Sequence, residues 1–155
     1  MQTRIVGLAF VLFIAGCSAS AVASMLPGST LPLVTVTTRG GECPEGACGS
    51  RLVVERDGRL HQTEPENVVF GQVTPEALVV LDGAIKTTDF AAMRARPFTG
   101  ECPITFDGQE VIYEFGAPGG VERIASCETE IEPEHPLFRA VELALATGGA
   151  MDGGG

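Results

Sequence analysis

The fold follows from the stretch Leu33-Val34-Thr35-Val36-Thr37-Thr38, whose β-branched side chains favour an extended backbone. Arg51–Glu55 has a similar character and predicts a second strand. Asp57-Gly58 favours a tight hairpin turn, after which Arg59–Thr63 predicts a third strand. Asn67–Val73 adds a further extended segment. The short connections between these segments favour antiparallel pairing.

A helix is predicted where the residue pattern changes. Thr74 can cap a helix, Pro75 suits its first position, and Glu76 favours the positive end of the helix dipole. The helix should end near Thr87, and Gly83 weakens its interior. Its buried face is predicted to carry Leu78, Leu81 and Ile85.

The second half of the chain predicts a strand pair and a closing helix. Phe90 and Met93 are interpreted as apolar anchors on the same core. Glu110–Phe115 predicts a strand, Gly116–Gly120 its turn, and Val121–Ile131 the strand that returns. The last helix and its buried stripe are predicted from His135-Pro136, Leu137, Phe138, Val141 and Leu145. This order predicts an α+β fold, a single mainly antiparallel sheet with two helices on one face.

An export signal precedes this domain. The apolar run Ile5–Ile14 is too short to span a bilayer permanently. Ile14-Ala15-Gly16-Cys17 closes it and resembles the bacterial lipobox, which implies that Cys17 receives lipid and becomes the first mature residue. Ser18 follows, as in lipoproteins sent to the outer membrane of Gram-negative bacteria. Cleavage after Ala21-Val22-Ala23 is the alternative and would give a secreted or periplasmic protein.

The chain is therefore predicted to have four parts. Residues 1–16 form a lipoprotein signal peptide, and residues 17–30 form a flexible tether. Residues 31–146 form a single α+β domain, which is long enough for one modest core and too short for two. Residues 147–155 form a disordered, Gly-rich tail.

The mature chain is strongly acidic. Loss of residues 1–16 removes Arg4, which leaves nine Lys plus Arg residues against twenty Asp plus Glu residues. This charge repels phosphate backbones and anionic headgroups, so it argues against nucleic acid as a partner and against electrostatic attachment to a membrane. The membrane contact is expected through the N-terminal lipid, because two or three acyl chains hold a protein durably.

Four cysteines remain once Cys17 is assigned to lipid, an even number that suits an oxidising compartment such as the cell envelope. Three pairings are open, and pairing between sequence neighbours is the most economical. The predicted structural disulfides are Cys43–Cys48 and Cys102–Cys127. A thiol-redox role is disfavoured because the first pair lacks Cys-x-x-Cys spacing and because Glu42 and Glu45 raise the pKa of neighbouring thiols.

The sequence carries no recognisable catalytic motif. No serine of the mature chain lies in a Gly-x-Ser-x-Gly setting, and neither His61 nor His135 lies in a triad context. His135 is interpreted as a residue at the start of a helix. Four glutamates alternate along the chain and would share one face of an extended backbone: Glu128, Glu130, Glu132 and Glu134. We interpret this face as the solvated face of a strand, and calcium binding by the carboxylates is the alternative. We expect no enzyme activity, no cofactor and no metal.

A resemblance covers most of Leu33–Ala146. A strand is followed by a loop with Gly40-Gly41, a second strand, a helix ending in Asp89-Phe90, a hairpin, and a closing helix after Pro136. This plan resembles emfourin, a family of small bacterial inhibitors of thermolysin-type metalloproteases, and related domains of unknown function, some of them in lipoproteins. The resemblance implies that the loop near Gly40-Gly41 enters a protease cleft. The lipobox and the loop cysteines distinguish this chain from the inhibitors.

We therefore expect a lipid-anchored, extracytoplasmic, non-enzymatic domain that binds or stabilises another cell-envelope component. The expected contact surface is the loop Arg39–Ser50, pinned by a disulfide, and its named contact residues are Arg39, Gly40, Gly41 and Glu42. Preorganising such a loop lowers the ordering cost of association. The alternative for this loop is a purely structural role, in which the disulfide closes the end of a hairpin and the loop contacts no partner. For the whole protein the alternatives are an emfourin-like protease inhibitor and, further, an enzyme or thiol-redox protein.

The protein purified from its native membrane is expected to begin at Cys17, to carry acyl chains and to contain two disulfides. Intact mass spectrometry with and without reduction and alkylation measures all three properties. A mass that begins at Ser24, or four thiols that alkylate without reduction, would contradict the anchored and disulfide-bonded interpretation.

Overall fold

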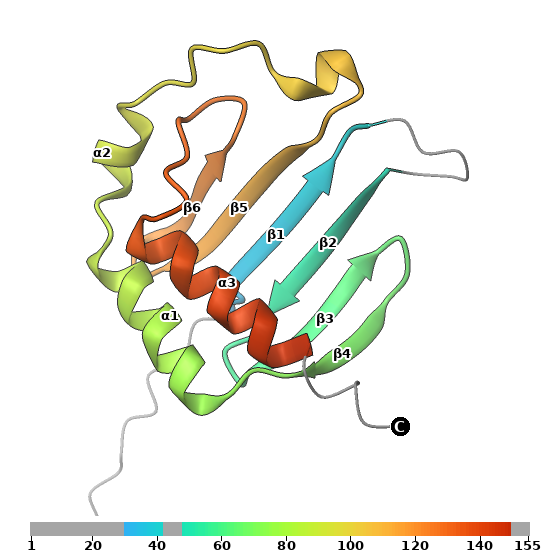
Figure 1. The fold of residues 1–155 in the computed structure, drawn as a ribbon. Coiled ribbons are helices and arrows are strands. Elements are labelled where there is room, and N and C mark those ends of the chain that lie inside the picture. Colours follow the sequence, from blue (N-terminus) through green and yellow to red (C-terminus); the bar gives the residue numbers. More distant parts are fainter. Residues whose placement is uncertain (1–29, 42–47, 150–155) are drawn as a thin grey trace, which may run out of the picture.

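The computed structural model describes residues 30–41 and 48–149. Within these residues six strands form one antiparallel sheet in the order β4-β3-β2-β1-β5-β6 (Figure 1). The strands are β1 (Val34–Arg39), β2 (Gly49–Val54), β3 (Arg59–Glu64), β4 (Val68–Gln72), β5 (Glu110–Ala117) and β6 (Gly120–Ala125). The helices are α1 (Pro75–Thr87), α2 (Phe90–Arg94), the 3-10 helix η1 (Pro103–Phe106) and α3 (Pro136–Gly149). The predicted α+β fold with an antiparallel sheet is confirmed.

Strand β1 lies in the middle of the sheet, with β2 on one side and β5 on the other. Val34 pairs with Val54 and with Phe115, and each of these three side chains is at most 1% exposed. Thr35 points to the opposite face, because side chains alternate along a strand, and it is only 4% exposed. The β-branched stretch is thus buried on both faces at its N-terminal end.

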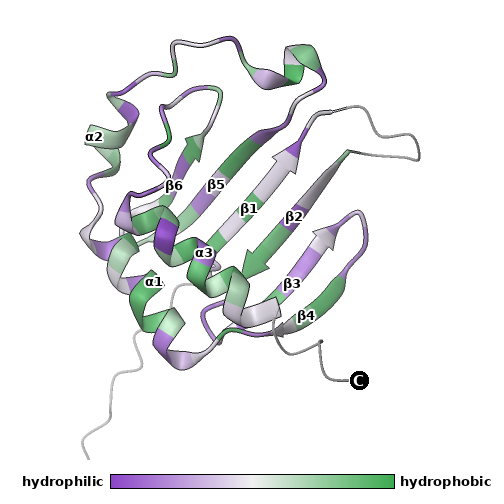
Figure 2. Ribbon diagram, viewed as in Figure 1, coloured by the Kyte–Doolittle hydropathy of each residue, from purple (hydrophilic) through white to green (hydrophobic). Residues whose placement is uncertain are grey.

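Helices α1 and α3 lie side by side across one face of the sheet (Figure 1). The Thr74 hydroxyl accepts a hydrogen bond from the amide of Ala77, so Thr74 caps α1 as predicted. Figure 2 shows hydrophobic stretches on α1 and at the end of β2. The helix residues buried in the core are Ala77, Leu81, Ile85, Leu137, Phe138, Ala140, Val141 and Ala144.

Aromatic rings connect the sheet to the helices. The ring of Phe115 lies 5.5 Å from that of Phe90 and 5.9 Å from that of Tyr113, and Tyr113 lies 5.0 Å from Phe138. Phe90 and Met93 are both buried, so their predicted role as apolar anchors is confirmed. Burial, with a smaller contribution from the nearby Glu142 carboxylate, raises the pKa of Tyr113.

The return strand is shorter than the sequence predicts. Strand β6 ends at Ala125, and the prediction of a strand through Ile131 is wrong. The amides of Glu128 and Thr129 both donate to the Ala125 carbonyl, at 3.0 and 2.9 Å, and turn the chain out of the sheet. The turn brings Cys127 to Cys102 in the predicted disulfide, with 5.1 Å between their Cα atoms.

Helix α3 continues through Gly149, three residues beyond the predicted end of the domain at Ala146. Packing explains the extension, because Gly148 is buried against the sheet. A Cβ at Gly148 would lie 2.7 Å from Leu60 Cδ2 and 3.0 Å from Val73 Cγ2. Any larger residue here would displace the side chains of Leu60 or Val73, so this glycine lies within the helix at a packing contact and does not end it.

Several predicted features lie outside the described residues. These are the signal peptide, the tether up to residue 29, Cys17, Glu42 and Cys43, so the Cys43–Cys48 disulfide stays a prediction. In the part of the chain that the structure describes, no helix is long and apolar enough to cross a membrane.

Two glycine substitutions test the helix packing in opposite directions. Gly83 is exposed inside α1 with open space at its Cβ position, so Gly83→Ala is expected to raise the free energy of unfolding by about 0.5–1 kcal/mol. Gly148→Val is expected to lower it by about 1–3 kcal/mol through overpacking against Leu60 and Val73. Urea unfolding measures both changes. Equal effects of the two substitutions would contradict the packing of α3 on β3.

Candidate functional site

Two surface regions lie at opposite ends of β1. At the start of β1, a pocket surrounds Arg56 and Leu31, and we call it the Arg56 pocket. At the end of β1, Gly40 and Gly41 meet the η1 segment, whose Ile104 and Phe106 are exposed. We call these four residues the loop-end surface. The distance along β1 between the two regions is about 20 Å, since six extended residues separate them.

The predicted contact residues Gly40 and Gly41 are seated on the η1 segment. Both have φ +88°, a left-handed conformation that favours glycine. A Cβ at Gly40 would overlap Ile104 Cγ2 and lie 3.0 Å from the Gly108 carbonyl oxygen. A Cβ at Gly41 would lie 3.3 Å from the Asp107 carbonyl oxygen. This part of the loop is therefore a braced segment and not a free-standing tip.

The η1 segment is itself tightly constrained. Cys102, at its N-terminal end, is joined to Cys127 by the disulfide. The Thr105 amide donates to the Cys102 carbonyl at 3.0 Å, and the Gly108 amide donates to the Pro103 carbonyl at 2.8 Å. No residue of η1 is buried, and the Phe106 side chain is 65% exposed. A large aromatic ring is thus held outward on a fixed turn.

An ion pair fixes the end of β1 beneath this surface. Arg39 Nε lies 2.6 Å from Glu110 Oε2. The Glu110 side chain is 2% exposed, whereas Arg39 is 57% exposed. A buried carboxylate requires such a partner, because an unpaired buried charge is strongly unfavourable. The predicted contact residue Arg39 therefore also has a structural role.

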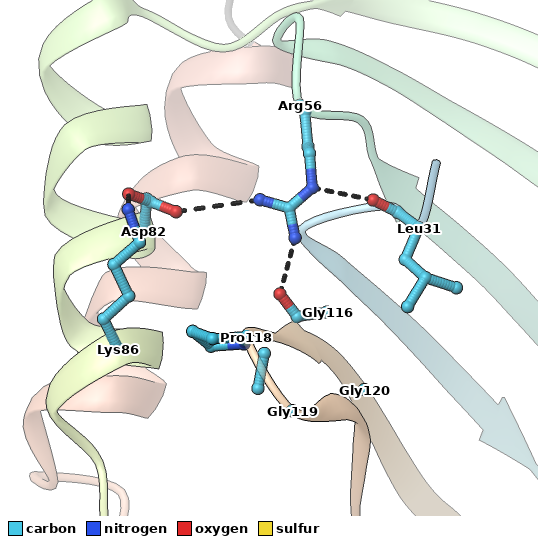
Figure 3. Close-up of a pocket in the computed structure, with 9 residues that line it drawn as sticks. Leu31, Arg56, Asp82, Lys86, Gly116, Pro118, Gly119 and Gly120 are labelled. Atoms are coloured by element: carbon cyan, nitrogen blue, oxygen red, sulfur yellow. Dashed lines mark hydrogen bonds and ion pairs between the residues drawn. The ribbon is translucent and has the colours of Figure 1, made fainter. Parts of the chain in front are cut away.

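The Arg56 pocket is a hollow of about 380 Å³ in which one guanidinium links the segment before β1, strand β5 and helix α1 (Figure 3). Arg56 Nε donates to the Leu31 carbonyl at 2.9 Å, and Nη2 donates to the Gly116 carbonyl of β5 at 2.6 Å. Its Nη1 lies 3.7 Å from Asp82 Oδ1 on α1. Asp82 also accepts a 2.5 Å hydrogen bond from Lys86 Nζ. The pocket wall opposite α1 is the β5–β6 turn, with Pro118, Gly119 and Gly120.

The two histidines lie in separate settings. His61 Nε2 is 3.0 Å from Glu55 Oε1 on the sheet. His135 Nδ1 accepts a hydrogen bond from the Leu137 amide at 3.2 Å, which supports its interpretation as a helix-start residue.

The alternating glutamates do not share the face of a strand, because the chain turns at residues 126–128. Three of them bind different arginines instead: Glu128 with Arg123, Glu132 with Arg96, and Glu134 with Arg139. Within residues 30–41 and 48–149, no group of three or more His, Cys, Asp or Glu side chains is arranged to hold a metal ion. The geometry that motivated the calcium alternative is therefore absent from these residues.

Comparison of the chain with protein-family models, with curated proteins and with solved structures gives no match. The function must therefore be inferred from the residues themselves.

Sequence reasoning missed Ile104, Phe106, Arg56 and Lys86 as site residues. One local signal pointed to Phe106, an aromatic residue in a loop bounded by Cys102-Pro103 and Gly108. No local signal pointed to the Arg56 pocket, because its residues come from four segments that meet only in the fold.

Removal of the Arg39 guanidinium is expected to destabilise the fold. Arg39→Gln leaves the Glu110 carboxylate buried without its cation and should lower the free energy of unfolding by about 1–3 kcal/mol. Arg59→Gln is the matched control, since Arg59 pairs with the exposed Asp57, and we expect no measurable change. Chemical denaturation compares the two variants with the wild type. Indistinguishable midpoints for Arg39→Gln and Arg59→Gln would refute this role of Arg39.

Proposed function

We propose that this protein is a lipid-anchored, non-enzymatic domain of the cell envelope that binds another envelope protein through its loop-end surface. The observation that carries the proposal is the display of Phe106 on a disulfide-anchored turn beside Gly40 and Gly41. In a Gram-negative organism the lipoprotein would reside in the outer membrane, and a secreted or periplasmic form is the alternative.

An exposed aromatic side chain on a rigid support is well suited to protein binding. Phenylalanine offers a large apolar contact area with few rotatable bonds, and aromatic residues dominate many interfaces. The η1 segment is already ordered by the Cys102–Cys127 disulfide and by its own hydrogen bonds, so little further ordering is required on association. Ile104, which is 41% exposed, extends the apolar contact.

The position of this surface fits anchoring through Cys17. The tether would join the domain at Leu31, beside the start of β1, and the loop-end surface lies at the other end of β1. A membrane at the Leu31 end would therefore leave Phe106 accessible. The proposed Cys43–Cys48 disulfide would close the loop next to this surface and restrain it further.

Inhibition of a thermolysin-type protease is the second candidate function. The observation that favours it is the braced, left-handed conformation of Gly40 and Gly41, which presents a fixed loop as the resemblance to emfourin implies. Substitution of either glycine would disturb the fold as well as the contact. An inhibition assay should therefore compare wild type with Phe106→Ser, which alters an exposed side chain only.

Site-specific photocrosslinking in cells tests the proposed binding surface. A benzoylphenylalanine at position 106 is expected to give a discrete protein adduct that excess wild-type protein suppresses. The same probe at Val79, which is 73% exposed at the other end of the molecule, is the matched control and should not give this adduct. Binding of the purified partner should fall at least about tenfold in Phe106→Ser. Equal adducts at both positions, or adducts that wild type does not suppress, would overturn the proposal.

A further inference from the structure

We propose that the Arg56 pocket binds a phosphate group, with Lys86 and the preset Arg56 guanidinium supplying the positive charge. The proposal rests on the charge, shape and position of the pocket. The phosphate group could belong to the headgroup of a membrane lipid or to free phosphate in solution.

The charged side chains that line the pocket leave one positive charge without a counterion. Arg56 and Lys86 both pair with the same carboxylate, that of Asp82. In a chain with twenty acidic residues and ten basic ones, this is an unusual local excess of positive charge. A bound anion would neutralise it, and charge-assisted hydrogen bonds to phosphate are among the stronger polar contacts in proteins.

The pocket also has a suitable shape and partial shielding from water. The side chains of Arg56 and Asp82 are each 32% exposed, so their charges act in a partly desolvated setting. Two backbone carbonyls, of Leu31 and Gly116, hold the guanidinium in place before any ligand arrives (Figure 3). Gly119 and Gly120 have open space at their Cβ positions, so these two residues of the wall place no side chain in the pocket.

Apolar surface adjoins the cations on the same helix face. Val79, Asp82 and Lys86 follow the i, i+3, i+7 spacing of one face of α1. Val79 is 73% exposed and lines a second hollow that shares Arg56 and Asp82 with the pocket. Cations beside an exposed valine suit the boundary between headgroups and acyl chains.

Leu31, where the tether would enter the domain, lies in the pocket wall, so an anchor at Cys17 would bring the pocket near the membrane. Binding of a lipid headgroup therefore rests on the proposed anchor at Cys17. Binding of free phosphate in the pocket does not depend on that anchor. Because the chain as a whole is acidic, the site would orient an already anchored domain and would not attach it.

Lys86 is the only lysine of the chain, which gives a direct probe of the site. Selective ¹³C-lysine labelling of the full mature protein in a nonionic maltoside detergent should give a single ε-CH2 resonance. Inorganic phosphate is expected to shift this resonance in a saturable way, whereas chloride at matched ionic strength should not. Identical, non-saturating changes with both salts would overturn the proposal.

Three variants separate the pocket from general charge effects, with the phosphate-induced rise of the thermal unfolding midpoint as the readout. Lys86→Gln is expected to weaken phosphate binding at least about tenfold, because it removes a charge-assisted hydrogen bond. Asp82→Asn removes the competing carboxylate and should strengthen binding. Arg139→Gln removes a cation that pairs with Glu134 outside the pocket and should leave binding unchanged. Equal loss in Lys86→Gln and Arg139→Gln would refute the site.

Lipid nanodiscs distinguish the two sources of phosphate. With a headgroup ligand, the Lys86 resonance should already be shifted in phosphatidylglycerol discs relative to the phosphate-free maltoside detergent, and added phosphate should cause little further change. With a free ligand, the discs and the detergent should give the same resonance until phosphate is added. No shift in either case overturns the site, whereas failure of the anchor alone would appear as a mass that does not begin at Cys17.

Discussion

The structure depends on the burial of β1 between β2 and β5. Val34 forms cross-strand pairs with Val54 and Phe115, and all three are almost fully buried beneath the helices. Strand β5 comes from a distant part of the sequence, so the chain must cross from β4 at one edge to β5 on the far side of β1. The crossing segment contains α1 and α2, and α1 can bury its apolar face only against the sheet and α3.

The two ends of the sheet are held by different interactions. At the end of β1, the buried Glu110 carboxylate requires Arg39, and the Cys102–Cys127 disulfide fixes η1 beside Gly40 and Gly41. At its start, Arg56 ties Leu31 and Gly116 to α1 through two carbonyls and the Asp82 carboxylate. Each end therefore has a defined surface, one apolar and aromatic, the other positively charged.

This separation links the fold to the proposed function. With the proposed anchor at Cys17, the end of the domain at Leu31 would lie toward the membrane and the end with Phe106 would be accessible to a partner. The apolar contact of Phe106 suits a protein surface, whereas the cations around Asp82 suit an anionic group. The strongly acidic charge of the whole chain is the reason for expecting no nucleic-acid partner and no electrostatic attachment to a membrane.

The sequence by itself determined the positions of the first five strands, the limits of α1 and the antiparallel pairing, because β-branched runs, Asp57-Gly58 and Thr74-Pro75 act through local backbone preferences. Pairing between neighbouring cysteines also predicted the Cys102–Cys127 bridge. Only the tertiary structure decided that β6 stops at Ala125, that Gly148 lies within a helix, and that Gly40 rests on Ile104. The Arg56 pocket likewise arises from long-range contacts, since Leu31, Asp82 and Gly116 are brought to one guanidinium by strand order and helix packing, which no local preference encodes.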